Sequence, residues 1–223
     1  MKRKETIKRV VSNLFLITLF LIGLILIFNS QIRSFLLNKQ TKQYDIANYS
    51  KQELEKNLET IGNFDFDSVE SISNELVLRA QFENNNLPVI GGISIPSIEL
   101  SLPIFKGLDN ASLLAGAGTM KEDQHMGKSN YALASHSTVD KSLLFSPLEF
   151  ISTKEKIYLT DLKKIYTYEV TFKEKVDPSR IEFIENIPEK NMITLVTCGD
   201  LAAITRLIVQ GVLIDSIEFT SAS

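Results

Sequence analysis

The 223-residue sequence contains one cysteine, two histidines and no tryptophan. A single cysteine, Cys198, excludes an internal disulfide, so this residue is buried packing, an intermolecular link or a reactive thiol. An excess of positive charge is also missing, since the net charge is −3. No basic cluster occurs beyond the N-terminal flank, which argues against nucleic acid as the main partner. Internal repeats and low-complexity tracts are absent from the sequence as well.

Charged residues are missing from one stretch near the N-terminus, Val10 to Phe28. A helix of that length spans about 28 Å, close to the roughly 30 Å hydrocarbon core of a bilayer. Residues 1–9 are rich in Lys and Arg, whereas the flank after the stretch is sparser in positive charge. The positive-inside rule then leaves the N-terminus in the cytoplasm and exports the rest. The alternative is a cleaved signal peptide, but the stretch is long and no A-x-A pattern follows it.

Four successive segments are predicted: a cytoplasmic basic tail (1–9), a transmembrane helix (10–28), an extracellular stem (29–86) and a globular domain (87–223). The stem is polar and low in glycine. Ser50 and Glu53 have the spacing of a capping box, which predicts that a helix begins there, and a second helix is expected over residues 73–83. In the alternative interpretation, residues 29–86 are the first part of the domain itself.

Short β-type runs separated by turn signals follow residue 86. They cover residues 90–95, 99–105, 130–135, 156–160, 165–172, 192–197, 205–213 and 214–219. Residues 111–117 are expected to form one helical turn, and residues 143–148 a short helix or loop. Many short strands with few helices predict a closed antiparallel barrel.

Cys198 ends the apolar run that begins at Met192. Strand alternation puts Thr194, Val196 and Cys198 on one face. If the loop 199–204 joins neighbouring antiparallel strands, Arg206 lies beside Cys198. Arg206 is then either a solvated edge residue or a hydrogen-bond donor to a developing oxyanion.

His136 follows the apolar run Tyr131 to Ser135, whereas His125 lies in a polar loop and is expected at the surface. A cysteine nucleophile is usually activated by a neighbouring imidazolium. Since a histidine at a strand end is more often structural, the residues alone leave the role of His136 open.

Thr194-Leu-Val-Thr-Cys198 together with Arg206 resembles the TLxTC...R signature of the sortases, transpeptidases of Gram-positive bacteria. Tyr131-Ala-Leu-Ala-Ser-His136 is similar to the family's segment that leads to its catalytic histidine, with Ser135 in place of the commoner glycine. Residues 91–96, 102–107 and 116–120 resemble the class A, or housekeeping, group and especially its streptococcal-type members. The likeness extends from about Pro88 to Phe219.

The resemblance implies a mainly β fold: an eight-stranded sortase-type barrel with short helices, placed after the membrane helix and the stem. Cys198 would attack the Thr–Gly carbonyl of an LPxTG sorting signal. His136 would act as general acid and base, and Arg206 would stabilise the oxyanion. The implied partners are LPxTG-bearing surface proteins and the amine of lipid II, and the product is a surface protein attached to peptidoglycan. The alternatives are an extracellular cysteine peptidase and a non-catalytic surface module.

The resemblance also suggests substrate-binding residues. Thr197 would orient the substrate threonine. Ile184 and Pro188 would line the groove for the Leu-Pro end of the signal. No cofactor is expected, although some class A sortases bind Ca²⁺ between two loops. The acidic residues that could mimic such a site are Glu122, Asp123, Glu182, Glu185 and Glu189.

Overall fold

The computed structural model describes residues 2–82, 86–200 and 204–220. The chain divides into two compact units, with the boundary between Leu36 and Leu37. In the first unit, helix α1 (Lys2–Ile27) contains an apolar window, Val10–Ile27, with a mean hydropathy of 2.7 and no buried share. By length and composition this helix can cross a membrane, as the sequence predicts. Helix α2 (Asn29–Gln43) follows it.

Short helices precede the sheet in the second unit: η1 (Ile46–Asn48), α3 (Lys51–Leu58), η2 (Phe66–Ser68) and α4 (Asn74–Phe82). The predicted capping box is present at the start of α3. The amide of Glu53 donates to Ser50 Oγ at 3.3 Å, and the amide of Ser50 donates to Glu53 Oε2 at 2.8 Å. The helix predicted over residues 73–83 is α4.

The segment before residue 87 packs on the barrel. Leu37 and Leu54 are each only 1% exposed. Tyr44 and Leu54 belong to one buried apolar cluster with four barrel-side residues, Leu87, Val89, Phe105 and Ala115. The compact unit therefore starts well before the residues of the first strand.

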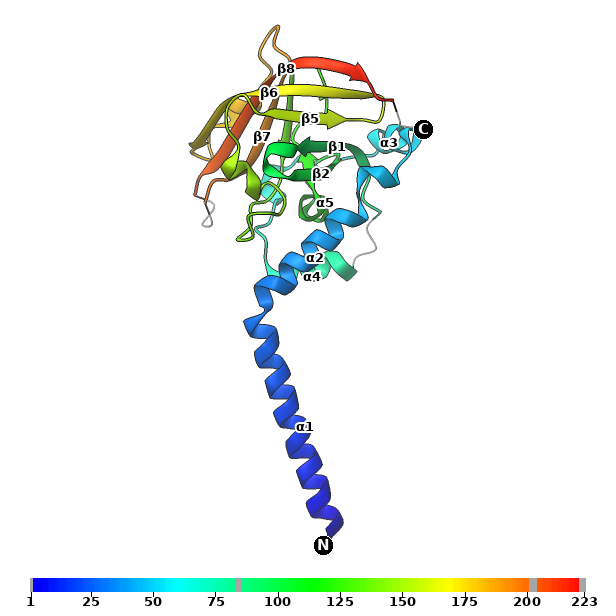
Figure 1. Ribbon diagram of the computed structural model, residues 1–223, viewed down its shortest axis with the longest axis vertical. Helices are drawn as coiled ribbons and strands as arrows, with labels where there is room; N and C mark the ends of the chain where they lie inside the picture. Colours follow the sequence, from blue (N-terminus) through cyan, green and yellow to red (C-terminus); the bar gives the residue numbers. More distant parts are fainter. Residues whose placement is uncertain (1, 83–85, 201–203, 221–223) are drawn as a thin grey trace. The chain divides into compact units, whose positions relative to one another are not determined.

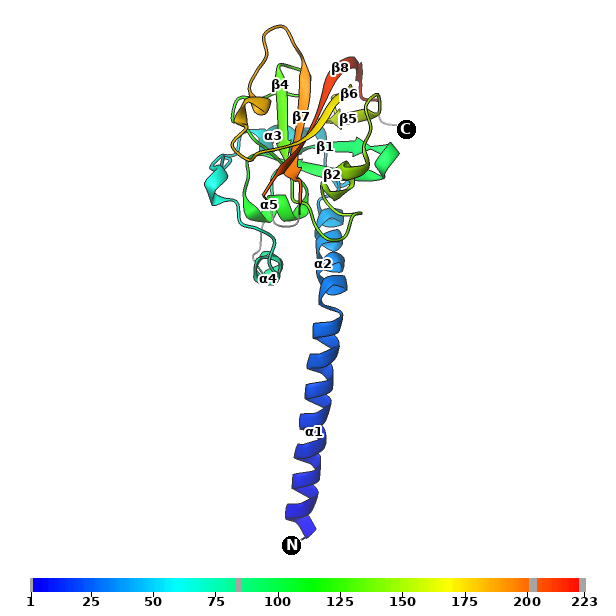
Figure 2. The same ribbon diagram turned by 90° about the vertical axis from the view of Figure 1, so that its left-hand side faces the viewer.

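Eight strands form a closed barrel in the order β1-β2-β3-β4-β7-β8-β6-β5 (Figures 1 and 2). They are β1 (Val89–Ile95), β2 (Leu100–Phe105), β3 (Ala117–Thr119), β4 (Asn130–Ala134), β5 (Lys156–Thr160), β6 (Lys164–Val176), β7 (Met192–Cys198) and β8 (Arg206–Glu218). Between them lie η3 (Pro96–Ile98), α5 (Asn110–Ala115), η4 (Ser146–Phe150) and η5 (Ile181–Ile184). The closed eight-stranded barrel is as predicted.

The sheet is mixed, so the prediction of a wholly antiparallel barrel was wrong. β2 pairs with β3 in parallel, and β4 pairs with β7 in parallel. The crossover between β2 and β3 contains α5, where a helical turn was expected. β3, only three residues long, gives too short a pattern to predict. The two strands expected over residues 205–219 are one long strand, β8, which bends through irregular pairing with β6.

The two faces of β7 have different surroundings, and this positions the site. Ile193, Leu195 and Thr197 are buried, whereas Val196 and Cys198 are partly exposed. Met192 and Thr194, on the same face as Cys198, are buried as well, so this row of β7 reaches the surface only at Val196 and ends at Cys198. We call the end of the barrel where β4 and β7 finish the rim.

Candidate active site

Cys198 and Arg206 are the last pair of the antiparallel ladder between β7 and β8. Directly opposite residues project to the same side of a sheet, with Cβ atoms about 4.5–5.5 Å apart. Both residues are partly exposed, whereas Leu207 and Ile208 beyond them are buried. A thiol and a guanidinium therefore share one opening, as the strand pattern predicts. Arg206 Nη1 donates to the carbonyl of Thr205 at 3.2 Å.

His136 lies at the same rim because β4 and β7 run parallel. Ala134 is paired with Val196, so His136 and Cys198 each follow that pair by two residues. His136 is 7% exposed, and burial lowers the pKa of its imidazole to about 4. The ring is therefore neutral at pH 7.

One nitrogen of His136 is unpaired. Nε2 is buried and has no hydrogen-bond partner among the described residues. An unsatisfied buried polar atom costs about 1–3 kcal/mol, and such atoms in native proteins commonly mark a functional role. The geometry thus offers a neutral acid–base group at the same rim as a thiol.

Hydrogen bonds fix the segment that carries His136. Thr197 Oγ1 donates to the carbonyl of Ser135 at 2.8 Å, and Ser135 Oγ donates to the carbonyl of Gly116 at 2.6 Å. The amide of Phe145 donates to the carbonyl of His136 at 3.0 Å. Thr197 lies on the face of β7 opposite to Cys198, so its hydroxyl links β7 to the residue before His136. Ser135, which stands where the family that the sequence resembles more commonly has glycine, takes part in this link.

A cavity of about 250 Å³ opens at the rim. Its lining includes Thr197, Cys198 and Asp200 together with Lys141, Glu149 and Lys175. Glu149 forms ion pairs with Lys141 at 2.7 Å and with Lys175 at 3.9 Å, and the nearby lysines lower the pKa of its carboxyl. The thiol therefore borders a polar cavity with both signs of charge.

An apolar patch leads away from Cys198 on the other side. Four partly buried side chains, Val69, Ala134, Ile184 and Val196, pack against one buried cluster made by Leu108, Leu113, Met120 and Ala132. Val196 and Cys198 are two residues apart on one strand face, about 7 Å. Ile184, a predicted substrate-binding residue, thus lies on an apolar surface that reaches the thiol. Pro188, further along the same loop, is exposed.

A buried polar network holds the loop that contains η5. Asn130 Nδ2 donates to the carbonyls of Phe183 and Glu185 at 2.8 and 2.9 Å. Thr194 Oγ1 donates to Asn130 Oδ1 at 2.8 Å, and Gln210 Nε2 donates to the carbonyl of Phe183 at 3.1 Å. The sequence pattern gave neither Asn130 nor Gln210 as a site residue. Each of the two is a polar side chain in a largely apolar strand, and this is the sequence signal that could have identified them.

Lys121 joins the loop after β3 to the η5 loop. Its Nζ donates to the carbonyl of Asn130 and to Asn186 Oδ1, both at 2.7 Å. Partial burial lowers the pKa of this amine. Among the described residues, no group of three or more His, Cys, Asp or Glu side chains is arranged to hold a metal ion. Within the described part of the chain, the positive charge between the two loops therefore comes from the ammonium group of Lys121 and not from a group of metal ligands.

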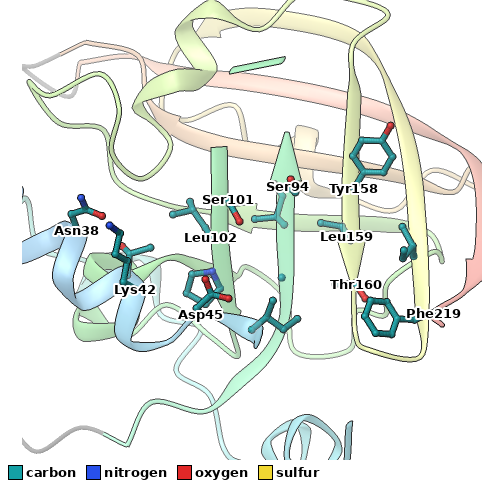
Figure 3. A pocket seen from close by; sticks show the side chains of 16 residues that line it. Asn38, Lys42, Asp45, Ser94, Ser101, Leu102, Tyr158, Leu159, Thr160 and Phe219 are labelled. Carbon is teal, nitrogen blue, oxygen red and sulfur yellow. The ribbon is translucent and has the colours of Figure 1, made fainter. Parts of the chain in front are cut away.

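A larger cavity, about 470 Å³, lies elsewhere on the barrel (Figure 3). Its lining comes from the end of α2 and the start of η1, from β1, β2, β5 and the start of β6, and from Phe219, and includes Lys42, Ser94, Ser101 and Tyr158. None of these elements carries Cys198, His136 or Arg206. Volume alone therefore does not identify the reactive site.

Similarity to known proteins extends over most of the chain. The family model for the sortase domain matches residues 93–214. The chain is 48% identical to sortase A of Streptococcus agalactiae over 94% of this chain and 87% of the relative. It is 38% identical to sortase A of Listeria monocytogenes over 85% of each chain. The crystal structure of the Listeria monocytogenes sortase A has a TM-score of 0.58 and 41% identity, covering 60% of this chain and 92% of that one.

Proposed function

This chain belongs to the sortase family, and from that premise we propose how its own residues carry out the reaction. It is a cysteine transpeptidase of the sortase A type, which anchors LPxTG surface proteins to the cell wall. The observation that supports the residue roles is the meeting of three groups at one rim. They are a partly exposed thiol, a buried imidazole with an unpaired Nε2, and an arginine opposite the thiol.

We propose that Cys198 is the nucleophile. Its sulfur attacks the carbonyl carbon between Thr and Gly of the sorting signal, and its proton passes to His136. Arg206 donates N–H groups to the oxyanion that develops. The C–N bond then breaks as His136 gives its proton to the departing glycine amine, which leaves a thioester on Cys198.

In the second half of the reaction, an amine acceptor attacks the thioester carbon. His136 takes the proton of the amine, and the Cys198 sulfur leaves and regains a proton. The finer assignment is that the acceptor amine belongs to lipid II and the donor is an LPxTG-bearing surface protein. Dividing an amide exchange through a thioester requires no nucleotide, because the energy of the first amide bond is kept in the intermediate.

For the signal itself, we propose that its Leu-Pro end lies along Ile184, with Pro188 toward the outer end of the same loop. Ile184 supports this because it packs with Val196 on the cluster that leads to Cys198. Thr197 acts as a positioning residue, since its hydroxyl holds the residue before His136.

We also propose the membrane topology. Residues 1–9 are cytoplasmic and residues 10–28 span the membrane. Residues 29–86 form the stem, of which the part from Leu37 onward packs on the barrel, and the catalytic domain of residues 87–223 lies outside the cell. The apolar helix and the basic flank support this arrangement. A topology reporter such as cysteine labelling from each side of the membrane tests it.

The reaction is tested with the full chain in detergent micelles and a fluorogenic LPxTG peptide, with and without an amine acceptor. A ligated product is expected with the amine, and a thioacyl adduct on Cys198 is expected by mass spectrometry. Cys198→Ala should abolish both while keeping the circular dichroism spectrum. Hydrolysis alone, even with excess amine, would point to the peptidase alternative.

A further inference from the structure

Val69 is the unexpected member of the apolar patch beside Cys198. The other three, Ala134, Ile184 and Val196, belong to the barrel or to its η5 loop. Val69 belongs to the segment before the barrel, which the proposed reaction does not use. It is only partly buried, so that part of its side chain is open to a ligand.

The segment that carries Val69 is fastened to the barrel. Lys106 Nζ donates to the carbonyl of Leu58 at 2.8 Å, and the amide of Leu108 donates to the carbonyl of Asn63 at 2.6 Å. Asn110 makes the attachment nearest to Val69. Its Nδ2 donates to the carbonyl of Ser68 at 3.2 Å, and its Oδ1 accepts from the amide of Glu70 at 2.8 Å. Both neighbours of Val69 are therefore held by one side chain.

Close backbone contact strengthens this attachment. Gly107 has a φ of +86°, and a Cβ there would lie 2.6 Å from the Asn63 carbonyl oxygen. Inside the segment, Asn63 Nδ2 donates to Ser68 Oγ at 3.0 Å, and the η2 turn is capped by Asp65. Figure 2 shows the cyan segment with η2 and the gold turn η5 on the same side of β4 and β7. The segment is thus an ordered part of the surface beside the apolar patch.

Distance connects Val69 to the substrate. The leucine of an LPxTG signal precedes the reacting threonine by three residues, at most about 10 Å of extended chain. Val196 lies about 7 Å from Cys198 along β7, and the cluster beneath Val196 also supports Val69. The apolar start of the signal is therefore long enough to reach this patch when the Thr–Gly bond is at the thiol.

We propose that Val69 is a specificity-determining residue, and that residues 63–70 form a wall of the groove that receives the leucine of the sorting signal. This inference rests on the proposed assignment of Cys198 as the nucleophile that attacks the Thr–Gly bond. It gives the segment before the barrel a direct part in choosing substrates.

The test uses the full chain in detergent micelles, an amine acceptor, an LPxTG peptide and the matched APxTG peptide. Val69→Ala should raise KM for LPxTG about three- to tenfold, as for the loss of about one methylene of buried apolar contact. Because the contact is remote from the reacting bond, kcat should change less than about twofold. The preference for LPxTG over APxTG should fall by the same factor as KM rises. Val69→Ile, which has a branched apolar side chain at the same position, should keep most of the wild-type preference for LPxTG.

Ile61→Ala is the matched control, since Ile61 precedes the proposed wall in the same segment and its side chain is 99% exposed. It should leave KM and the preference unchanged. Asn110→Ala releases Ser68 and Glu70 without altering the Val69 side chain, and should lower the preference in the same direction as Val69→Ala. This second variant keeps the test decisive if Val69→Ala does not fold.

The proposal is wrong if the wild-type enzyme is active and both Val69→Ala and Asn110→Ala keep its preference for LPxTG over APxTG. A lower KM in Val69→Ala also overturns it, because the segment would then obstruct the groove. Failure of the proposed function is distinct: wild-type protein would form no thioacyl adduct on Cys198 with either peptide.

Discussion

The Cys198 thiol and the Arg206 guanidinium are set opposite each other by strand register rather than by the loop between them. They close the β7–β8 ladder as its final pair. The amide of Gly199 donates to the carbonyl of Thr205 at 2.9 Å directly beyond that pair. The separation of the two backbone positions is therefore set by the hydrogen-bonded ladder of the barrel.

This register predicts a large catalytic role for Arg206. Arg206→Ala removes donors directed at the oxyanion, and kcat should fall about 100- to 1,000-fold. Arg206→Lys keeps the charge but loses the planar fork, so its rate should lie between those of the wild type and the alanine variant. Steady-state peptide cleavage measures both. A kcat within about threefold of wild type in Arg206→Ala would contradict the role.

Burial of His136 predicts loss of stability in acid. The folded imidazole has a pKa of about 4, below its ordinary value of 6.5. Between these pH values the unfolded chain binds one more proton than the folded chain, so the folded state loses stability as the pH falls from about 6.5 to about 4. The full loss amounts to about 3 kcal/mol.

His136→Gln should remove that component of the pH dependence. The measurement is urea unfolding at neutral pH and at about pH 4.5, in the wild type and the variant. His125→Gln is the control, because His125 is exposed. The assignment fails if His136→Gln and the wild type lose the same free energy of unfolding on acidification.

Asn130 should hold the η5 loop for substrate binding. Asn130→Ala takes a donor from the carbonyls of Phe183 and Glu185, and should lower the free energy of unfolding by about 1–3 kcal/mol. Hydrogen exchange at residues 181–185 should rise, and KM for an LPxTG peptide should rise with it. Asn191→Ala is the control, since exposed Asn191 accepts from the amide of Ser129 outside this network. Equal effects of the two variants would refute a special role for Asn130.

Lys121 predicts activity that does not depend on Ca²⁺. The ammonium group joins the two loops through Asn130 and Asn186, so EGTA should leave the rate of the wild-type enzyme unchanged. Lys121→Met keeps the length of the side chain and loses the ammonium group, and should raise KM while leaving kcat nearly unchanged. A rate that falls with EGTA and returns with added Ca²⁺ would show that an ion is needed as well.

The local part of the site could be predicted from the sequence. Alternation along a strand places Thr194, Val196 and Cys198 on one face, and a short loop between antiparallel strands brings Arg206 to Cys198. These relationships involve residues that are near in sequence, so that strand periodicity alone carries them. The capping box at Ser50 and the apolar helix from Val10 are local in the same sense.

The non-local part could not be predicted from strand patterns. His136 meets Cys198 because β4 and β7 pair in parallel, although 62 residues separate Ser135 from its hydrogen-bond partner Thr197. An alternating pattern gives the face of each strand and says nothing of its neighbour or direction. Only the resemblance to the sortase family indicated that His136 and Cys198 belong to one site. Val69 had no signal of its own, since Phe64, Phe66 and Ile72 are also apolar residues of this segment and the contacts of Val69 are tertiary.

The ring of Tyr44 stands edge-on to Phe105, with the centroids 5.6 Å apart. This contact has a practical consequence for sample preparation. A fragment cut at Leu87 loses Tyr44 and Leu54 and uncovers Val89 and Phe105, which invites self-association through bare apolar surface. Dimers formed by such a fragment would report an uncovered core rather than a physiological assembly. Soluble preparations that keep the native surface should begin at Leu37.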